Sequence, residues 1–295
     1  MRTRWSSMAM MLWAAASYGL VTPLAKAAVA SGVPVRLFTT YQYPAPLLVF
    51  GAAALISRRS QPIPVRHEWP RLILVGASAA ATAVTYYQAL RFLPASDAVV
   101  LLFQFAWMLP VMAWVVHRTP PTKRQWGAIF GVLLGTAIAG GLTSFHVTSW
   151  KGMALGLAAA LSYAATLFWQ ARVPEGLSLW GRSLVSTAAG SVVAALAYRP
   201  WAIGVPQADG PGLFYGSIMG LVGLALPMSL TYLSAPRLGD ARTAILASFE
   251  LPVAVGLSHW WLHESIGLNE WVGVLLILLS IAAGAWPTPF SAPAS

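Results

Sequence analysis

The sequence has few charged residues and no cysteine. Asp, Glu, Lys and Arg make up 9% of the 295 residues, whereas a soluble domain carries about 25%. Hydrophobic residues make up 58%, and the mean hydropathy is +0.67. This composition excludes an ordinary soluble globular protein and indicates a chain that crosses a membrane several times. The absence of cysteine excludes disulfides and thiol chemistry.

Motifs for nucleotide-driven and catalytic machinery are missing as well. The chain has no Gly-x-x-x-x-Gly-Lys motif, so we do not expect ATP to be the direct energy source. Ser258 and His259 are adjacent on a predicted helix and point about 100° apart, so they cannot form a nucleophile–base pair. His259 and His263 share a helix face, but no third metal ligand is evident nearby. We therefore predict no catalytic residue, no metal site and no cofactor.

Long stretches without a charged side chain account for most of the chain. They cover residues 5–25, 37–57, 72–90, 98–116, 125–150, 152–171, 183–198, 210–236 and 271–295. A helix needs roughly 20 apolar residues to cross about 30 Å of hydrocarbon. With the apolar segment around Glu250, these stretches give ten candidate spans. The expected fold class is an all-α integral membrane protein with ten transmembrane helices in the lipid bilayer.

The basic residues lie in short loops and are shared unevenly between the two sides of the membrane. Thirteen of the 18 Lys and Arg fall on the side that holds both termini. The five on the other side are Lys26, Arg36, Arg91, Lys151 and Arg199. The positive-inside rule then places both termini in the cytoplasm, for a protein of the cytoplasmic (inner) membrane. This distribution explains the net charge of +10 without a nucleic-acid partner.

The two halves of the chain resemble each other. "LPVMAWVVH" (109–117) matches "LPVAVGLSH" (251–259), and "GVLL" occurs at 131–134 and 273–276, both at a spacing of 142 residues. "ASYG" (16–19) resembles "LSYA" (161–164) at a spacing of 145. We divide the chain into one repeat at 1–147 and another at 148–295, which together form one transport domain. Because each repeat holds five spans, an odd number, the second must enter the membrane inverted, as in secondary transporters.

The end of the second repeat carries a specific motif. It consists of Glu250 and Pro252 in an acid–x–Pro arrangement, Glu264 at the end of the same span, and Gly273 at the start of the last span. With its two five-helix repeats, the chain resembles the EamA-type drug/metabolite transporter superfamily. Its aromatic-rich middle is similar to the YddG-type aromatic amino acid exporters. The resemblance implies export of small metabolites from the cytoplasm.

The first repeat departs from this motif at its acids. It keeps Pro110 and Gly131, but Met108 lies opposite Glu250 at the spacing of 142, and Thr122 lies opposite Glu264. The fold therefore does not require an acid in both repeats. A carboxyl group in an apolar span can carry a proton, but where a proline distorts the helix it can also accept hydrogen bonds from backbone N–H groups that the distortion frees. We favour a structural or gating role for Glu250 over proton coupling, with Pro110 and Pro252 as hinges.

Polar and aromatic residues in mid-span are the candidates for a substrate site. Inverted repeats place such a site near the bilayer midplane, where rings can stack on a flat substrate and amides or hydroxyls can orient a polar head. The candidates are Ser17, Tyr18, Thr82, Tyr86, Tyr87, Gln88, Phe103, Gln104, Trp107, Tyr163, Trp169 and Ser248. The competing interpretation is that many of these rings face lipid or belong to interfacial belts.

The predicted function is a secondary exporter that works by alternating access through a central cavity. The expected partner is a small-molecule substrate, with aromatic and other apolar amino acids as the leading guess. A multidrug or nucleotide-sugar carrier of the same fold is one alternative, and a membrane-embedded enzyme is another. Anionic sugar nucleotides require basic residues inside the cavity, and here nearly every Lys and Arg falls in a loop. The sequence does not define an oligomeric state.

Overall fold

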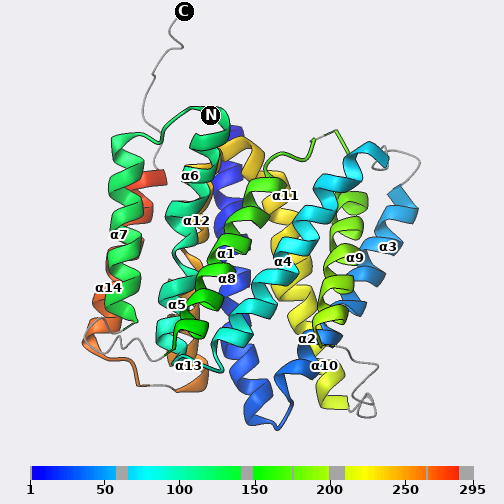
Figure 1. Ribbon diagram of the computed structural model, residues 1–295, viewed down its shortest axis with the longest axis horizontal. Helices are drawn as coiled ribbons and strands as arrows, with labels where there is room; N and C mark the ends of the chain where they lie inside the picture. Colours follow the sequence, from blue (N-terminus) through cyan, green and yellow to red (C-terminus); the bar gives the residue numbers. More distant parts are fainter. Residues whose placement is uncertain are drawn as a thin grey trace, which may run out of the picture.

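The protein is a bundle of helices (Figure 1). A computed structural model describes residues 2–57, 66–140, 149–174, 176–198, 210–263 and 265–285. No strand occurs in these residues, which confirms the all-α prediction. The start of α1 (Arg2–Ala30) and the end of α14 (Leu268–Ala285) lie at the same end of the molecule (Figure 1).

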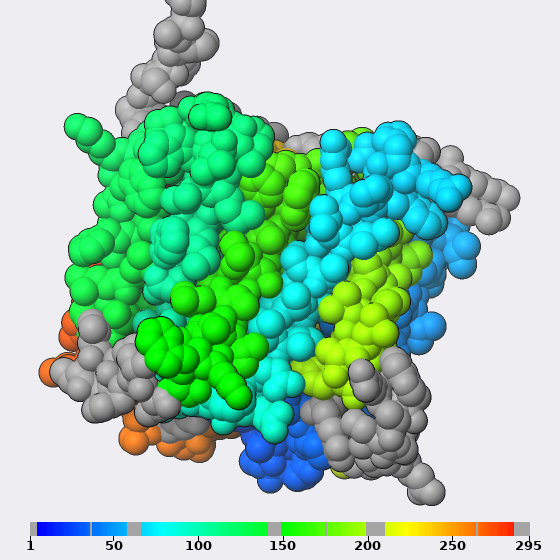
Figure 2. Space-filling view, in the orientation of Figure 1, coloured from blue at the N-terminus to red at the C-terminus, as the bar shows by residue number. Residues whose placement is uncertain are grey.

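The remaining helices follow in chain order. They are α2 (Val35–Tyr41), α3 (Pro44–Ser57), α4 (Trp69–Ala89), α5 (Ala95–Leu102), α6 (Phe105–His117), α7 (Lys123–Ala139), α8 (Trp150–Gln170), α9 (Leu179–Tyr198), α10 (Gly210–Gly220), α11 (Leu226–Leu238), α12 (Asp240–Ala247) and α13 (Glu250–Leu262). A short π-helical segment, Leu221–Ala225, joins α10 to α11. In the space-filling view, α4 crosses the visible face obliquely between α8 and α9, both of which it contacts (Figure 2).

Eight helical segments in the described residues are long and apolar enough to cross a membrane. Three of these segments each contain two α-helices: α5 with α6, α10 with α11, and α12 with α13. Two of the ten expected spans are not among the eight. One is divided into α2 and α3, and α3 has only 14 residues. The other is α7, whose 17 residues extend roughly 26 Å. Both pack beside a full-length span, α3 against α9 and α7 against α14 (Figure 1).

Two spans are interrupted at equivalent points of the two halves. The backbone changes from i→i−4 to i→i−3 hydrogen bonds between α5 and α6, where the Gln104 N–H bonds to Leu101. It does so again between α12 and α13, where the Phe249 N–H bonds to Leu246. The helices around these breaks start 145 residues apart, at Ala95 and Asp240, at Phe105 and Glu250, and at Lys123 and Leu268. α6 and α13 also end alike, each with a left-handed residue, Arg118 and His263.

Small residues allow the helices to approach closely. A side-chain carbon on Gly135 of α7 would lie 2.8 Å from the carbonyl oxygen of Gly273 on α14. In the same way, Gly156 lies against Leu101, and Gly216 lies against Tyr41. Glycines spaced four apart serve this purpose in membrane helices, where packing rather than water drives association.

Large apolar side chains cover the outside of the bundle. Ile56 is 82% exposed, Leu48 is 75% exposed and Trp13 is 70% exposed. A soluble monomer rarely exposes so much contiguous apolar surface, whereas lipid tails are as apolar as these side chains. The interior contains both apolar and polar groups, and α9 alone buries Arg182, Ser183, Ser186 and Thr187.

Candidate functional site

Glu250 is the first residue of α13, directly after the break between α12 and α13. Its side chain is half-buried, and its Oε2 accepts a hydrogen bond of 3.2 Å from the hydroxyl of Tyr163 on α8. Tyr163 itself is buried. We expected the carboxylate to accept a backbone N–H freed by Pro252, but the hydrogen bond found comes from a phenol on another helix. The break thus brings the acid into contact with α8.

Aromatic rings surround this contact. The ring of Phe105, the first residue of α6, lies 4.5 Å from that of Tyr163 between centroids. Tyr18 of α1 meets Tyr163 edge-on at 6.0 Å. We call Tyr18, Phe105, Tyr163 and Glu250 the central cluster. It joins α1 and α6 from the first half of the chain to α8 and α13 from the second.

Two more candidates lie at the edge of the central cluster. Phe103 packs against Phe105, with ring centroids 5.6 Å apart. Tyr86 of α4 lies within electrostatic range of Glu250, as does Tyr18. The structure therefore brings Tyr18, Tyr86, Phe103, Tyr163 and Glu250 into one region of the bundle.

Gln104 and Trp107 fill the break between α5 and α6. The Gln104 amide nitrogen donates to the carbonyl oxygen of Val100 at 3.1 Å, and the Trp107 indole N–H donates to the Gln104 amide oxygen at 2.9 Å. Backbone groups released by an interrupted membrane helix need such partners, because no water is present to satisfy them. Their polar atoms therefore stabilise the break, and the Trp107 ring packs against the core beside the central cluster.

Three hydroxyl candidates bond to backbone carbonyls. Ser17 donates to Val222, Thr82 donates to Ser78 at 2.9 Å, and Ser248 donates to Ala244 at 3.0 Å. Helical Ser and Thr commonly form such bonds. Because these donors are already used, they are weaker candidates for contact with a substrate.

The last three candidates point elsewhere. The Tyr87 ring packs edge-on against Phe38 at 6.3 Å. The side-chain oxygen of Gln88 accepts from Arg91 at 3.2 Å near the end of α4. Trp169 packs against Phe168 at 5.3 Å within the core. Position along a span did not distinguish these residues from Tyr86, since only the helix packing decides which side faces the centre.

A second polar group, which the sequence did not reveal, lies near the ends of α6 and α8. Arg172 forms a two-pronged ion pair with Asp240, with N–O distances of 2.9 and 3.0 Å. Its guanidinium carbon also lies 3.3 Å from the centroid of the Phe168 ring, and its Nη2 lies 2.7 Å from Nε2 of His117. We call Arg172, Asp240, His117 and Phe168 the Arg172 cluster. Asp240 begins α12, and His117 ends α6 in the other half of the chain.

The comparison with protein families decides what kind of protein this is. The profile of the EamA-like transporter family matches residues 5–141 and, separately, residues 150–283. The chain belongs to the EamA-like transporter family. It is therefore an integral membrane transporter of small metabolites, as the resemblance implied. The family is not one of enzymes, which agrees with the expected lack of catalytic residues.

A solved structure supports the fold of this EamA-like transporter. That structure, titled "Crystal structure of protein", superimposes with a TM-score of 0.75 over 95% of this chain and 96% of its own, at 16% identity. At this identity the likeness concerns the fold alone. No curated protein sequence matches the chain.

The register of the repeats in the transporter differs from the one expected around the family motif. At the observed spacing of 145 residues, Phe105 rather than Met108 occupies the position of Glu250. Pro110 lies inside α6, and Pro252 lies in the first turn of α13, so the two prolines are not equivalent. The short identical sequence segments at a spacing of 142 concealed this register. They therefore also concealed that Phe105 is the counterpart of Glu250. Glu264, the other acid of the motif, lies outside the described residues.

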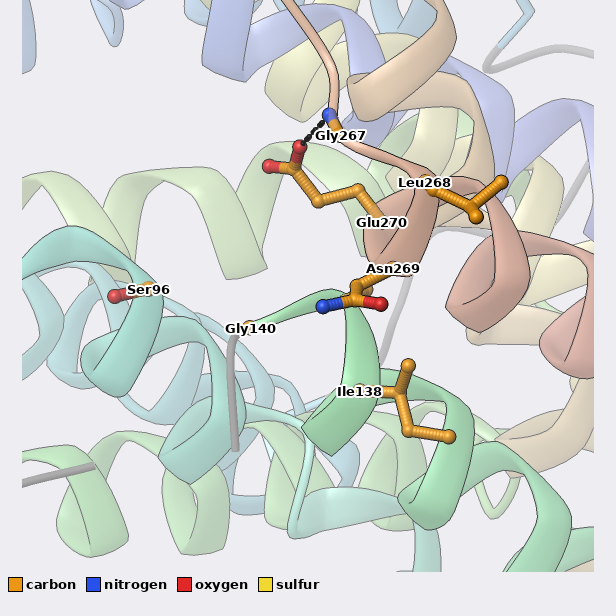
Figure 3. Close-up of a pocket in the computed structure, with 8 residues that line it drawn as sticks. Ser96, Ile138, Gly140, Gly267, Leu268, Asn269 and Glu270 are labelled. Carbon is orange, nitrogen blue, oxygen red and sulfur yellow. Dashed lines mark hydrogen bonds between the residues drawn. The ribbon is translucent and has the colours of Figure 1, made fainter. Parts of the chain in front are cut away.

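One hollow of the transporter lies away from the central cluster. It measures about 340 Å³, and its walls are Ser96 in the first turn of α5, residues 138–140 at the end of α7, and residues 267–270 at the start of α14. Glu270 bends back to accept the Gly267 N–H at 2.6 Å (Figure 3). The hollow contains no residue of the central cluster. Within the described residues, no group of three His, Cys, Asp or Glu is placed to hold a metal.

Proposed function

We propose that this transporter exports small aromatic or apolar amino acids, and that the central cluster is its substrate site. The proposal depends mainly on one observation, the Tyr163–Glu250 hydrogen bond within a group of aromatic rings. Rings stack on a flat or apolar side chain, and the phenol and carboxylate orient its polar head. The resemblance to aromatic amino acid exporters also favours a substrate of this class.

The proposed architecture is ten spans in two inverted five-helix repeats, residues 1–147 and 148–295, in the cytoplasmic (inner) membrane. The two family matches and the recurrence of helix starts at 145 residues support two repeats. α7 and the α2–α3 pair then supply the two spans beyond the eight long ones. The common position of the start of α1 and the end of α14 is consistent with an even number of crossings (Figure 1). Loop charge puts both termini in the cytoplasm.

Alternating access requires the cytoplasmic end of the protein to open and close. His117 is the last residue of α6, and Arg172 comes two residues after α8. Both helices end at the side of the molecule where α1 begins (Figure 1). The cluster ties α6 of the first repeat to α8 and α12 of the second. We propose that it closes the cytoplasmic side in this conformation, while the prolines that follow the two breaks, Pro110 in α6 and Pro252 in α13, act as hinges for the movement.

Transport by the purified protein tests this function. Liposomes that contain the full chain are expected to take up labelled Phe, Trp or Met faster than empty liposomes do. The same measurement with and without an imposed pH gradient separates proton-coupled transport from facilitated diffusion. Rates equal to those of empty liposomes for all three amino acids would contradict the amino-acid proposal.

A further inference from the structure

Within the described part of the chain, the Glu250 carboxylate has no cationic partner. Among the described residues, its hydrogen bond comes from the neutral Tyr163 hydroxyl through Oε2, and no Lys, Arg or His forms an ion pair with it. Arg172, which follows the same helix as Tyr163, is paired with Asp240 instead. The second carboxylate oxygen, Oε1, accepts no hydrogen bond from any described residue. The residue as a whole is half-buried rather than fully buried.

A carboxylate without an ionic partner inside a membrane span is stabilised by a positive charge. An ionised acid inside a membrane protein is costly unless another charge or several hydrogen bonds meet it. One phenol supplies only a single hydrogen bond. A ligand that brings its own cation would therefore gain more here than a neutral one.

The surrounding rings select the kind of cation. Phe105 and Tyr18 offer aromatic faces and edges, and Phe105 offers no oxygen or nitrogen at all. Organic ammonium groups are attracted to aromatic faces, whereas a metal cation such as Mg²⁺ or Ca²⁺ needs several oxygen ligands. In the described residues the carboxylate belongs to no group of three or more His, Cys, Asp or Glu side chains. The environment therefore suits an amine attached to an apolar or aromatic body.

The central cluster has no cationic side chain to pair with a substrate carboxylate. None of its four residues is basic, and the carboxylate of Glu250 would repel a second one. A zwitterionic amino acid would therefore gain from its ammonium group but not from its acid group. An amine without an acid group avoids that repulsion.

We propose that Glu250 binds the ammonium group of an organic amine whose apolar body packs against Phe105 and Tyr18, and that the substrate carboxylate is not required. The substrate class thus includes monocationic arylalkylamines as well as amino acids. This inference depends on the proposed function in one respect, since it takes the central cluster to be the transport site.

Three compounds that share a phenyl ring test the inference on the purified full chain in liposomes. They are 2-phenylethylamine, phenylalanine and 3-phenylpropionate, which carry the amine, both groups and the acid alone. Labelled 2-phenylethylamine is expected to bind, unlabelled phenylalanine is expected to compete equally or less well, and 3-phenylpropionate is not expected to compete. Glu250→Gln is expected to weaken amine binding at least about tenfold, because a charge-assisted hydrogen bond is lost.

Further variants separate recognition from folding. Glu250→Asp keeps the charge and should retain more binding than Glu250→Gln. Phe105→Leu keeps the charge and removes the ring, with an expected loss of about threefold to thirtyfold. As a matched control, Glu270→Gln removes an acid at the start of α14, away from the central cluster, and should leave amine binding unchanged.

The possible results distinguish this inference from the proposed function. Equal competition by 3-phenylpropionate, or unchanged amine binding in Glu250→Gln, would overturn the inference even if labelled phenylalanine is still transported. Absence of transport for every amino acid, together with amine binding that depends on Glu250, would refute the amino-acid proposal and support the amine site.

Discussion

The Arg172–Asp240 ion pair is the contact whose loss should most clearly change the conformation of the transporter. The two side chains are 19% and 17% exposed, and the pair is two-pronged. An exposed pair contributes about 0.2–1 kcal/mol, and removal of one partner from a fully buried pair costs about 3–5 kcal/mol. For a pair that is mostly but not fully buried, we take about 2 kcal/mol for Asp240→Asn.

If the pair holds the cytoplasmic side closed, this energy changes the population of open molecules. A difference of about 2 kcal/mol corresponds to a change of roughly thirtyfold in the ratio of open to closed forms. The other contacts of Arg172, with the Phe168 ring and with His117, remain in this variant. They limit the effect, so we expect an increase in the open form of about tenfold to thirtyfold.

Thiol labelling measures the open form directly, because the chain has no cysteine of its own. Thr243 is fully buried on α12, one turn after Asp240, and its hydroxyl has no hydrogen-bond partner among the described residues. Thr243→Cys is close in size and should react slowly with a membrane-impermeant maleimide applied to the cytoplasmic side. In the Asp240→Asn background, the reaction should become about tenfold to thirtyfold faster.

A matched control excludes a general loosening of the fold. Glu68→Gln breaks another acid–arginine contact, the one with Arg71 at 3.2 Å, which lies at the start of α4. It should leave the labelling rate of Thr243→Cys unchanged, and thermal unfolding should show that both backgrounds are folded. Equal labelling rates with and without Asp240→Asn would refute the role of the pair as a cytoplasmic closure.

Three further substitutions test the packing and the interrupted helices. Gly135→Ala should lower the thermal unfolding temperature, because the added carbon would lie 2.8 Å from the Gly273 carbonyl oxygen, whereas Gly127→Ala has open space and should be neutral or stabilising by up to about 1 kcal/mol. Trp107→Phe leaves the Gln104 amide oxygen unpaired and should lower the free energy of unfolding in detergent by about 1–3 kcal/mol. An unchanged unfolding midpoint would show that the hydrogen bond does not stabilise the break. Pro252→Ala restores a backbone N–H at the start of α13 and should slow transport with little change in substrate affinity; an unchanged rate would remove Pro252 from the hinges.

The candidate site could be anticipated only in part, and Glu250 and Phe105 show why. A carboxylate in an apolar span is conspicuous in any sequence, because the membrane makes it costly. Phe105 is one of 11 phenylalanines, and it looks like ordinary core until the break before α6 turns it toward Tyr163. Tyr86 and Tyr87 are neighbours in the sequence, yet one lies within range of Glu250 and the other packs on Phe38.

The sequence by itself determined the membrane location, the helical class, the repeated organisation and the family. These properties follow from composition and local pattern, since a bilayer admits apolar helices whose backbone bonds are satisfied internally. Only the tertiary structure decided which side chains meet: Tyr163 with Glu250, and Arg172 with Asp240. Those contacts join residues 87 and 68 positions apart, and their geometry depends on where two spans break and how closely the glycines let helices approach.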